Sequence, residues 1–177
     1  MERKLERKDL AGYFPYGLFT YVGTPHTEYS LIENLSNNLS VFHFKSNSGF
    51  EYTATIEDLK PLLYPLDALC KRYIYNGKEI IPIVELARIA KIPVKNNMYS
   101  IDTYSECVKY RHLDEDGLFA YHQERNAFVD IFNKQDCVVQ NQYELFDYLH
   151  ELKIDYRGLI DAGLAVSVYD LENNPYK

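Results

Sequence analysis

Residues 141–169, NQYELFDYLHELKIDYRGLIDAGLAVSVY, contain the elements around which the rest of the chain is expected to fold. The spacing of apolar residues predicts an amphipathic helix over 142–153, whose buried face carries Leu145, Phe146, Leu149 and Leu152. Asn141 is expected to cap this helix, and Glu144 is placed to complete a capping box. Asp155 then predicts the cap of a second, shorter helix before Gly163, and the alternation over 164–169 predicts a half-buried strand.

The chain before this segment predicts mostly antiparallel strands. Strands are expected over 18–22, 28–35, 39–45 paired with 50–56, and 73–75 paired with 78–80. Asn76-Gly77 predicts the turn of the last hairpin, because a type I′ turn needs two residues that tolerate positive φ. Residues 57–72 are helical in character, and Pro61 and Pro65 predict that they form two short helical pieces.

Residues 82–132 predict a helix followed by a three-stranded meander. Pro82 suits the first helical position and Pro93 the end, with an apolar stripe between them at Ile83, Leu86, Ala87 and Ala90. In the meander over 98–132, turns are expected at 114–117 and 124–126, with Leu113 paired with Leu118. This register predicts a core face with Val108, Tyr110, His112, Phe119 and Tyr121, and a solvent face with Lys109, Arg111, His122 and Glu124.

These elements predict the α+β class. We expect antiparallel sheets and meanders covered by a few short helices, with the C-terminal amphipathic helix packed on the sheet. The 177 residues are enough for one well-buried domain, so a single domain over 1–177 is expected.

The composition narrows the setting of the protein. Its 26 acidic and 19 basic residues give a net charge of −7, which disfavours nucleic acid and anionic membranes as partners. Three widely spaced cysteines fit a reducing compartment better than a disulfide framework. The charged segment 1–9 is not expected to be a signal peptide, and no apolar run approaches the roughly 20 residues of a membrane helix. A cytoplasmic protein is therefore expected, and its 17 tyrosines suit half-buried strands and protein interfaces.

No segment carries a recognisable catalytic, cofactor or metal motif. The five histidines (His26, His43, His112, His122 and His150) form no ligand pair, and a structural or surface role is expected for each. Cys70, Cys107 and Cys137 lack a nucleophile signature and are expected to be small buried hydrophobes. Accordingly, no catalytic, cofactor-binding or metal residue is assigned, and an active site assembled from distant residues stays an alternative.

One segment suggests nucleic-acid binding. ELARIAKIP at 85–93 is similar to the first half of a helix-turn-helix, whose recognition helix would begin near Val94. Residues 94–99 form a poor helix, and Lys91 stands where a turn glycine is usual. An amphipathic helix packed on the sheet is the preferred interpretation of 82–99, with a DNA-binding regulator as the alternative.

Three blocks, RKDLAGYFPYGL at 7–18, LKPLLYPLDAL at 59–69 and LFDYLHELKIDYRGLIDAGLAVSV at 145–168, resemble small uncharacterised proteins encoded by Bacteroidetes genomes, prophages and phages. The resemblance implies an accessory protein of a phage or mobile element in the cytoplasm of the bacterial host, and it assigns no site residues. The leading hypothesis is a non-enzymatic protein that binds a macromolecular partner, chiefly a host protein, and that could inhibit a host defence system. A virion-associated structural protein is a further alternative, and the oligomeric state stays open.

Overall fold

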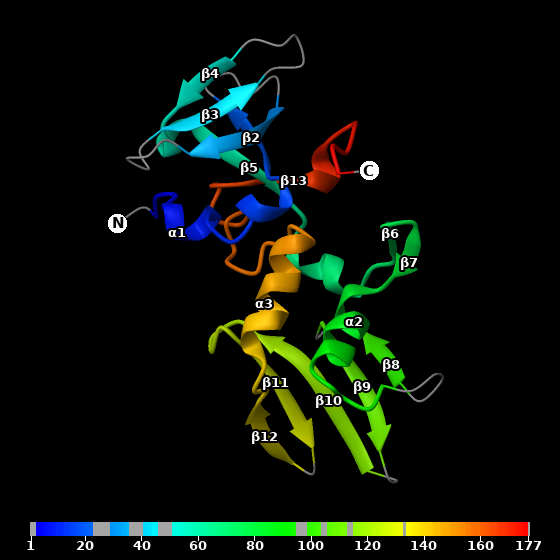
Figure 1. Ribbon diagram of the computed structural model, residues 1–177. Helices are drawn as coiled ribbons and strands as arrows, with labels where there is room; N and C mark the ends of the chain where they lie inside the picture. The colour runs from blue at the N-terminus through cyan, green and yellow to red at the C-terminus, as the bar shows by residue number, and fades with distance from the viewer. Residues whose placement is uncertain are drawn as a thin grey trace. The chain divides into compact units, whose positions relative to one another are not determined.

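The computed structural model describes residues 3–22, 29–35, 41–45, 51–94, 99–103, 106–112, 115–132 and 134–176 (Figure 1). Its helices are α1 (Arg7–Leu10), α2 (Pro82–Ile89) and α3 (Gln142–Glu151), and short 3-10 helices lie at Phe14–Tyr16, Ile56–Asp58, Leu66–Cys70 and Val168–Asp170. The strands form antiparallel sheets with one short parallel pairing, so the α+β class is confirmed. Within the described ranges, no helix is both long enough and apolar enough to span a membrane.

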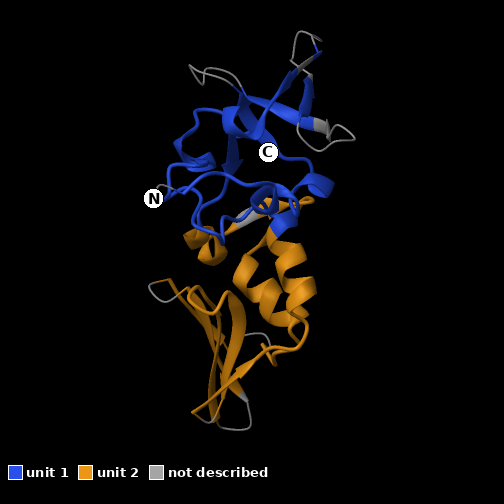
Figure 2. Ribbon diagram, turned by 90° about the vertical axis from the view of Figure 1, so that its left-hand side faces the viewer, with its two compact units in different colours: residues 1–65, 150–177 blue, residues 66–149 orange. Residues whose placement is uncertain are grey.

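The chain divides into two compact units (Figure 2). Unit 1 comprises residues 1–65 and 150–177, and unit 2 comprises residues 66–149. The second boundary falls inside α3, so one continuous helix belongs to both units. The expectation of a single domain over 1–177 stays a prediction, because compact units can unfold together or separately.

Unit 1 is built on a sheet with strand order β13-β5-β1-β2-β3-β4. Its strands are β1 (Phe19–Val22), β2 (Tyr29–Leu35), β3 (Phe42–Lys45), β4 (Glu51–Ala54), β5 (Leu59–Leu63) and β13 (Val166–Ser167). The strands predicted near 18–22 and 28–35 and the hairpin of β3 with β4 are confirmed. The pairing of β5 with β13 is parallel, with Val166 opposite Leu62, and all the other pairings in this sheet are antiparallel.

Strand β5 corrects the prediction of two helical pieces over 57–72. Its residues Leu59, Leu62 and Leu63 are all buried, although Leu62 and Leu63 point to opposite faces. A strand buried on both faces reads as a continuous apolar run, and such a run cannot be told from a buried helix by periodicity. Pro61 is tolerated within β5, opposite Thr20 of β1. Short 3-10 helices form only on the flanks, at Ile56–Asp58 and Leu66–Cys70.

The second helix predicted after Asp155 is absent from residues 156–163, which form turns. Gly158 and Gly163 both have positive φ, 68° and 70°, so a helix cannot continue past Gly158. Asp155 nevertheless binds backbone amides as a cap would, accepting from the N–H groups of Leu159 at 2.9 Å and Ile160 at 2.7 Å. The strand predicted over 164–169 is shorter than expected: β13 ends at Ser167, and a 3-10 helix follows.

Unit 2 contains a hairpin, helix α2 and a meander sheet. The hairpin joins β6 (Tyr73–Tyr75) to β7 (Lys78–Ile80), and φ is 49° at Asn76 and 74° at Gly77, as the predicted turn requires. Helix α2 begins at Pro82, and Ile83, Leu86 and Ala87 are fully buried, which confirms the predicted stripe except at half-buried Ala90.

The meander sheet has the strand order β12-β11-β10-β9-β8, in which every strand pairs with its neighbour in sequence. Its strands are β8 (Tyr99–Asp102), β9 (Cys107–His112), β10 (Glu115–His122), β11 (Ala127–Phe132) and β12 (Gln135–Val138). The predicted pairing of Leu113 with Leu118 is wrong, because His112 lies opposite Glu115 and β10 already begins at Glu115. The true register differs by an even number of residues, so the side chains keep their predicted faces. Val108, Tyr110, Phe119 and Tyr121 are buried as expected, and the turn after His122 is confirmed.

Helix α3 packs on the meander sheet as predicted. Leu145 and Leu149 are fully buried, and the Phe146 ring lies 5.6 Å from that of Phe128 and 6.1 Å from that of Tyr121, between centroids. The Gln142 side chain continues the sheet ladder, since it accepts from the N–H of Phe128 and donates to its carbonyl, both at 2.8 Å. The side-chain amide of Asn141 donates to the carbonyl of Ile89 at 2.8 Å, which links α3 to α2.

Candidate functional site

The described histidines have structural or surface positions. His150 packs edge-on against Tyr13, with 4.8 Å between ring centroids, and its Nε2 lies 2.9 Å from the Tyr156 hydroxyl. His122 accepts at Nδ1 from the N–H of Arg125 at 3.4 Å, and His43 is exposed on β3. His26 and the side chain of His112 lie outside the described residues. Among the residues that are described, no three His, Cys, Asp or Glu side chains gather closely enough to hold a metal ion.

The cysteines differ in exposure, and the prediction that all three are buried is wrong for one of them. Cys107 is buried and Cys70 half-buried, but Cys137 is exposed on β12. Strand β12 lies at the edge of the meander sheet, and all four of its side chains are exposed. Burial raises the pKa of Cys70 to about 12, with a smaller contribution from the nearby carboxylate of Glu106, and burial also raises the pKa of Cys107. Both thiols therefore stay protonated at neutral pH.

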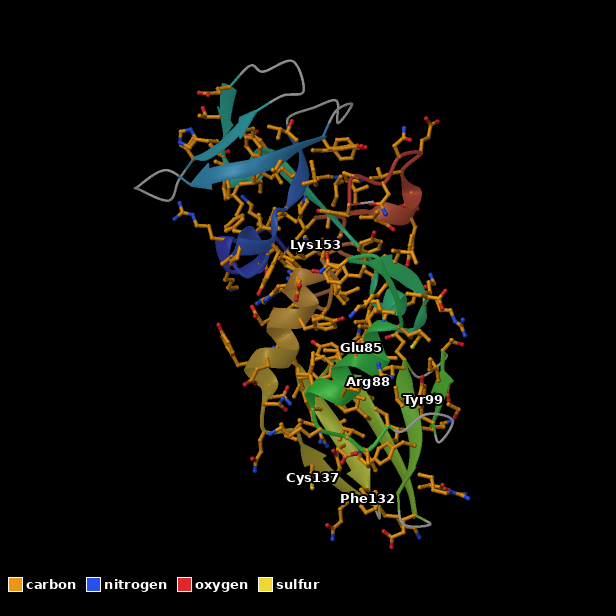
Figure 3. All side chains as sticks on the ribbon, turned by 45° about the vertical axis from the view of Figure 1, so that its right-hand side comes forward. Glu85, Arg88, Tyr99, Phe132, Cys137 and Lys153 are labelled. Atoms are coloured by element: carbon orange, nitrogen blue, oxygen red, sulfur yellow. The ribbon has the colours of Figure 1, made fainter. Side chains whose placement is uncertain are left out.

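The described residues that follow α2 do not form the recognition helix that the helix-turn-helix hypothesis for 82–99 requires. The chain leaves α2 through Lys91 with φ at 63°, Val94 is not helical, and Tyr99 already begins β8. Residues 95–98 lie outside the described ranges. On the outer side of α2, Glu85 and Arg88 pair with each other (Figure 3).

Unit 1 holds a buried lysine, Lys153, whose charge is satisfied internally (Figure 3). Its Nζ donates to the carbonyl of Glu151 at 2.7 Å and lies 5.4 Å from the ring centroid of Tyr176 and 5.8 Å from that of Tyr16. Burial lowers the pKa of Lys153. The Tyr176 hydroxyl donates to the carbonyl of Leu62 at 2.9 Å, so the C-terminal tail lies over β5. This cluster fastens the tail to unit 1 through cation–π contacts and hydrogen bonds.

An open groove of about 770 Å³ lies on the meander sheet of unit 2. We call it the outer groove and define it by the side chains of Lys109, Arg111, Asp116, Leu118, Ile131 and Lys134, which line it together with parts of the neighbouring backbone. The pairings place Ser100, Lys109, Leu118 and Ile131 directly opposite one another on four adjacent strands. Opposed residues share a face and successive residues alternate, so this row lies on the face opposite Phe119 and Phe128.

Tyr110 and Gly117 lie opposite each other on β9 and β10, and the Tyr110 ring packs across the sheet that forms the outer groove. The Tyr110 hydroxyl donates to a carboxylate oxygen of Asp130 at 2.6 Å, and the ring is parallel to that of Phe132 with 6.3 Å between centroids. To do so the ring crosses Gly117, where a Cβ would lie 2.3 Å from Tyr110 Cζ. Burial, reinforced by the hydrogen bond to Asp130, raises the pKa of Tyr110, so the phenol stays protonated. Figure 3 labels Phe132 at the end of β11 and Tyr99 on β8.

The groove combines an apolar floor with cations. Ile131 is 36% exposed and Leu118 is half-buried beside it. Val138, 54% exposed, lies on the same face of the next strand, because it pairs with Val129. Asp136 lies directly opposite Ile131 on β12 and Val138 lies two residues further along, so Leu118, Ile131 and Val138 form a diagonal apolar stripe across three adjacent strands.

Three cations line the groove together with Leu118 and Ile131. Lys109 Nζ lies 2.7 Å from Asp102, and this hydrogen bond raises the pKa of Lys109. Arg111 contacts Asp116 through Nε at 3.1 Å, and Asp116 is the residue that the sequence placed in an acidic turn. Lys134, in the tight connection between β11 and β12, has no ion pair among the described residues.

Sequence reasoning found part of this surface. It placed Lys109 and Arg111 on the solvent face, and the structure confirms that both are exposed. It included Ile131 in the predicted meander without assigning it to a face, and it missed Lys134, because strand β12 and its turn were not predicted. In β11, Val129 is buried and Ile131 is exposed although both lie on the same face. The sequence alone could not indicate this difference, because it depends on where the sheet ends.

Comparison with known proteins adds no relative: no family model, no curated protein and no solved structure matches the chain.

Proposed function

We propose that the chain is a non-enzymatic binding protein that contacts a protein partner through the outer groove and the adjoining stripe. The observation that carries the proposal is that Leu118, Ile131 and Val138 share the sheet face opposite α3, with two of them at least one third exposed. Exposed apolar side chains that are contiguous and rimmed by charges are typical of protein interfaces. Charges beside such a surface orient the partner that docks on it.

The setting of the proposal comes from the sequence. The resemblance of residues 7–18, 59–69 and 145–168 to small phage and prophage proteins supports a host protein as the partner, and inhibition of a host defence system is one form that this binding could take. Reduced cysteines support the cytoplasm of the bacterial host as the place where it happens.

The test is capture of host proteins by the tagged chain and two matched variants. Ile131→Glu puts a carboxylate into the outer groove. Leu31→Glu makes the same change on β2 of unit 1, where Leu31 is 37% exposed, against 36% for Ile131. Circular dichroism and a urea titration of each variant establish that it is folded, since changes at partly exposed positions usually alter stability little.

We expect at least one host protein to be retained by the wild type and by Leu31→Glu and lost with Ile131→Glu. Equal capture by all three proteins would mean that the partner binds elsewhere. If the wild type captures no specific protein, the proposal of a host partner is wrong.

A further inference from the structure

We propose that the segment bound in the outer groove is an acidic stretch of the partner protein. This inference rests on the proposed function and adds the chemistry of the partner. Of the groove's charged side chains three are cationic, Lys109, Arg111 and Lys134, and one is anionic, Asp116. The whole chain, by contrast, has a net charge of −7. The groove is thus a cationic area on an anionic protein, and such areas select partners of opposite charge.

The cations can accept further carboxylates. Arg111 uses Nε for Asp116, so the two terminal nitrogens of its guanidinium group are outside that bond. Lys134 pairs with no described residue, and its exposed ammonium can approach an incoming anion from solvent. The Arg111–Asp116 pair lies between exposed side chains, where water screens it, so a partner carboxylate can share or replace it. Asp102 is only 20% exposed and holds Lys109 more closely.

The dimensions suit a short extended segment. The row from Ser100 to Ile131 crosses four adjacent strands, which at about 4.8 Å per spacing corresponds to about 14 Å. An extended chain advances about 3.3 Å per residue, so about four residues fill this length. The apolar floor at Leu118 and Ile131 takes apolar side chains from such a segment, while Arg111 and Lys134 take its carboxylates. Nucleic acid is the weaker fit, because its phosphate backbone offers no apolar side chains to cover the floor at Leu118 and Ile131.

Fluorescence anisotropy with three labelled probes tests the inference. They are a peptide that alternates Glu with Leu, the same peptide with Lys for Glu, and single-stranded oligo-dT. The variants are Arg111→Glu and Lys134→Glu, with Lys78→Glu as the matched control. Lys78 is exposed on β7 of the same unit and does not line the groove, and its reversal changes the net charge equally.

We expect the acidic peptide to bind the wild type and Lys78→Glu alike, and each groove variant roughly tenfold more weakly, since each reversal replaces attraction by repulsion. Raising the salt from about 0.1 M to about 1 M shortens the screening length from about 10 Å to about 3 Å and is expected to weaken the wild-type complex further.

Equal binding of the lysine peptide, indifference to the groove reversals, or tighter binding of oligo-dT would each overturn the inference. The capture experiment separates this failure from that of the proposed function. A host protein lost with Ile131→Glu but retained by Arg111→Glu and Lys134→Glu leaves the outer groove as the binding surface and removes the acidic partner.

Discussion

The two units differ in how far apart in the sequence their paired strands lie. In unit 2 every strand of the meander sheet pairs with its neighbour in sequence, from β8 to β12. In unit 1, β5 lies between β1 and β13, and its parallel partner β13 comes from the far end of the chain. Arg3 donates to the carbonyl of Arg157 at 2.9 Å and Tyr13 to that of Ile154 at 2.7 Å, so the N-terminal segment also depends on the C-terminal one. Local contacts therefore build unit 2, and distant ones complete unit 1.

This difference shows what each unit depends on. The sheet of unit 2 forms from strands joined by short turns, so it depends on the residues of those turns. Unit 1 forms only when two segments pair that are separated in sequence by the whole of unit 2. Substitutions that act on one unit and are read out in the other can establish whether the two open together.

The largest effect is expected for Leu62→Ala in β5. Leu62 is fully buried, so its truncation is expected to lower the free energy of unfolding by about 2 to 5 kcal/mol. All three cysteines lie in unit 2. With Cys70 and Cys137 replaced by Ala, labelling of Cys107 by a thiol reagent reports the opening of unit 2 alone.

If residues 1–177 form a single domain, Leu62→Ala is expected to speed Cys107 labelling roughly thirtyfold or more, since 1.4 kcal/mol corresponds to a factor of ten. Leu31→Ala, at an exposed position of the same sheet, serves as the control with little change. A lower unfolding midpoint without faster labelling would show that unit 1 opens by itself and that the single-domain prediction fails.

The next largest effect is expected for Gly117→Ala, which should lower the free energy of unfolding by about 1 to 3 kcal/mol. The added Cβ collides with the Tyr110 ring and displaces its hydroxyl from Asp130. Urea titrations of Gly117→Ala, Tyr110→Ala and the double variant measure the coupling. We expect Gly117→Ala to cost less than about 1 kcal/mol once the ring is removed, and an unchanged cost would rule out the collision as its cause.

Asp155→Ala acts in unit 1 and is expected to cost about 0.5 to 2 kcal/mol, as the loss of a capping side chain does. The N–H groups of Leu159 and Ile160 lose their acceptor, and chemical denaturation measures the result. Asp155→Asn, which keeps an acceptor oxygen, is expected to lose less. Equal losses would assign the effect to packing instead of hydrogen bonding.

The same residue gives unit 1 a pH dependence. Burial raises the pKa of Asp155 above its usual 3.8, although its hydrogen bonds with backbone N–H groups lower it in part. The folded state therefore binds this proton more tightly than the unfolded chain. Relative to Asp155→Asn, the wild-type free energy of unfolding is expected to fall as the pH rises from about 3.8 through the folded-state pKa, and to stay constant above it. A rise over this window would contradict the assignment.

The smallest effect is expected for Gly77→Ala in the hairpin of unit 2, at about 1 kcal/mol. Apart from the glycine and its two chain neighbours, no heavy atom of the described residues lies within 4 Å of the added Cβ, so the cost comes from φ at 74° and not from crowding. Gly77→Asn, which tolerates this conformation better, is expected to recover part of the loss in a thermal melt. Without such recovery, the left-handed turn is not the source of the cost.

Prediction from sequence succeeded where the physics is local. The Asn76-Gly77 turn, helix α2 after Pro82 and the apolar face of α3 are all decided by residues close in the chain. It failed at β5, whose burial on both faces depends on β13, and at 156–163, where Gly158 takes a positive φ.

The outer groove was predicted from the sequence only in part. The alternation of Lys109 and Arg111 predicted a solvent face, but recognising the groove required the pairing of β10 with β11 and β12. No motif marks such a surface, because an interface is defined by which side chains adjoin across strands and not by their order in the chain.

The parallel pairing of Leu62 with Val166 has a consequence for synthesis on the ribosome. Strand β5 leaves the exit tunnel with two apolar faces and an unpaired edge, and its neighbour β13 is translated only after the whole of unit 2. The meander strands meet their partners as soon as they emerge. Residues 59–63 are therefore expected to need a chaperone on the nascent chain until residues 166–167 have emerged and paired with them.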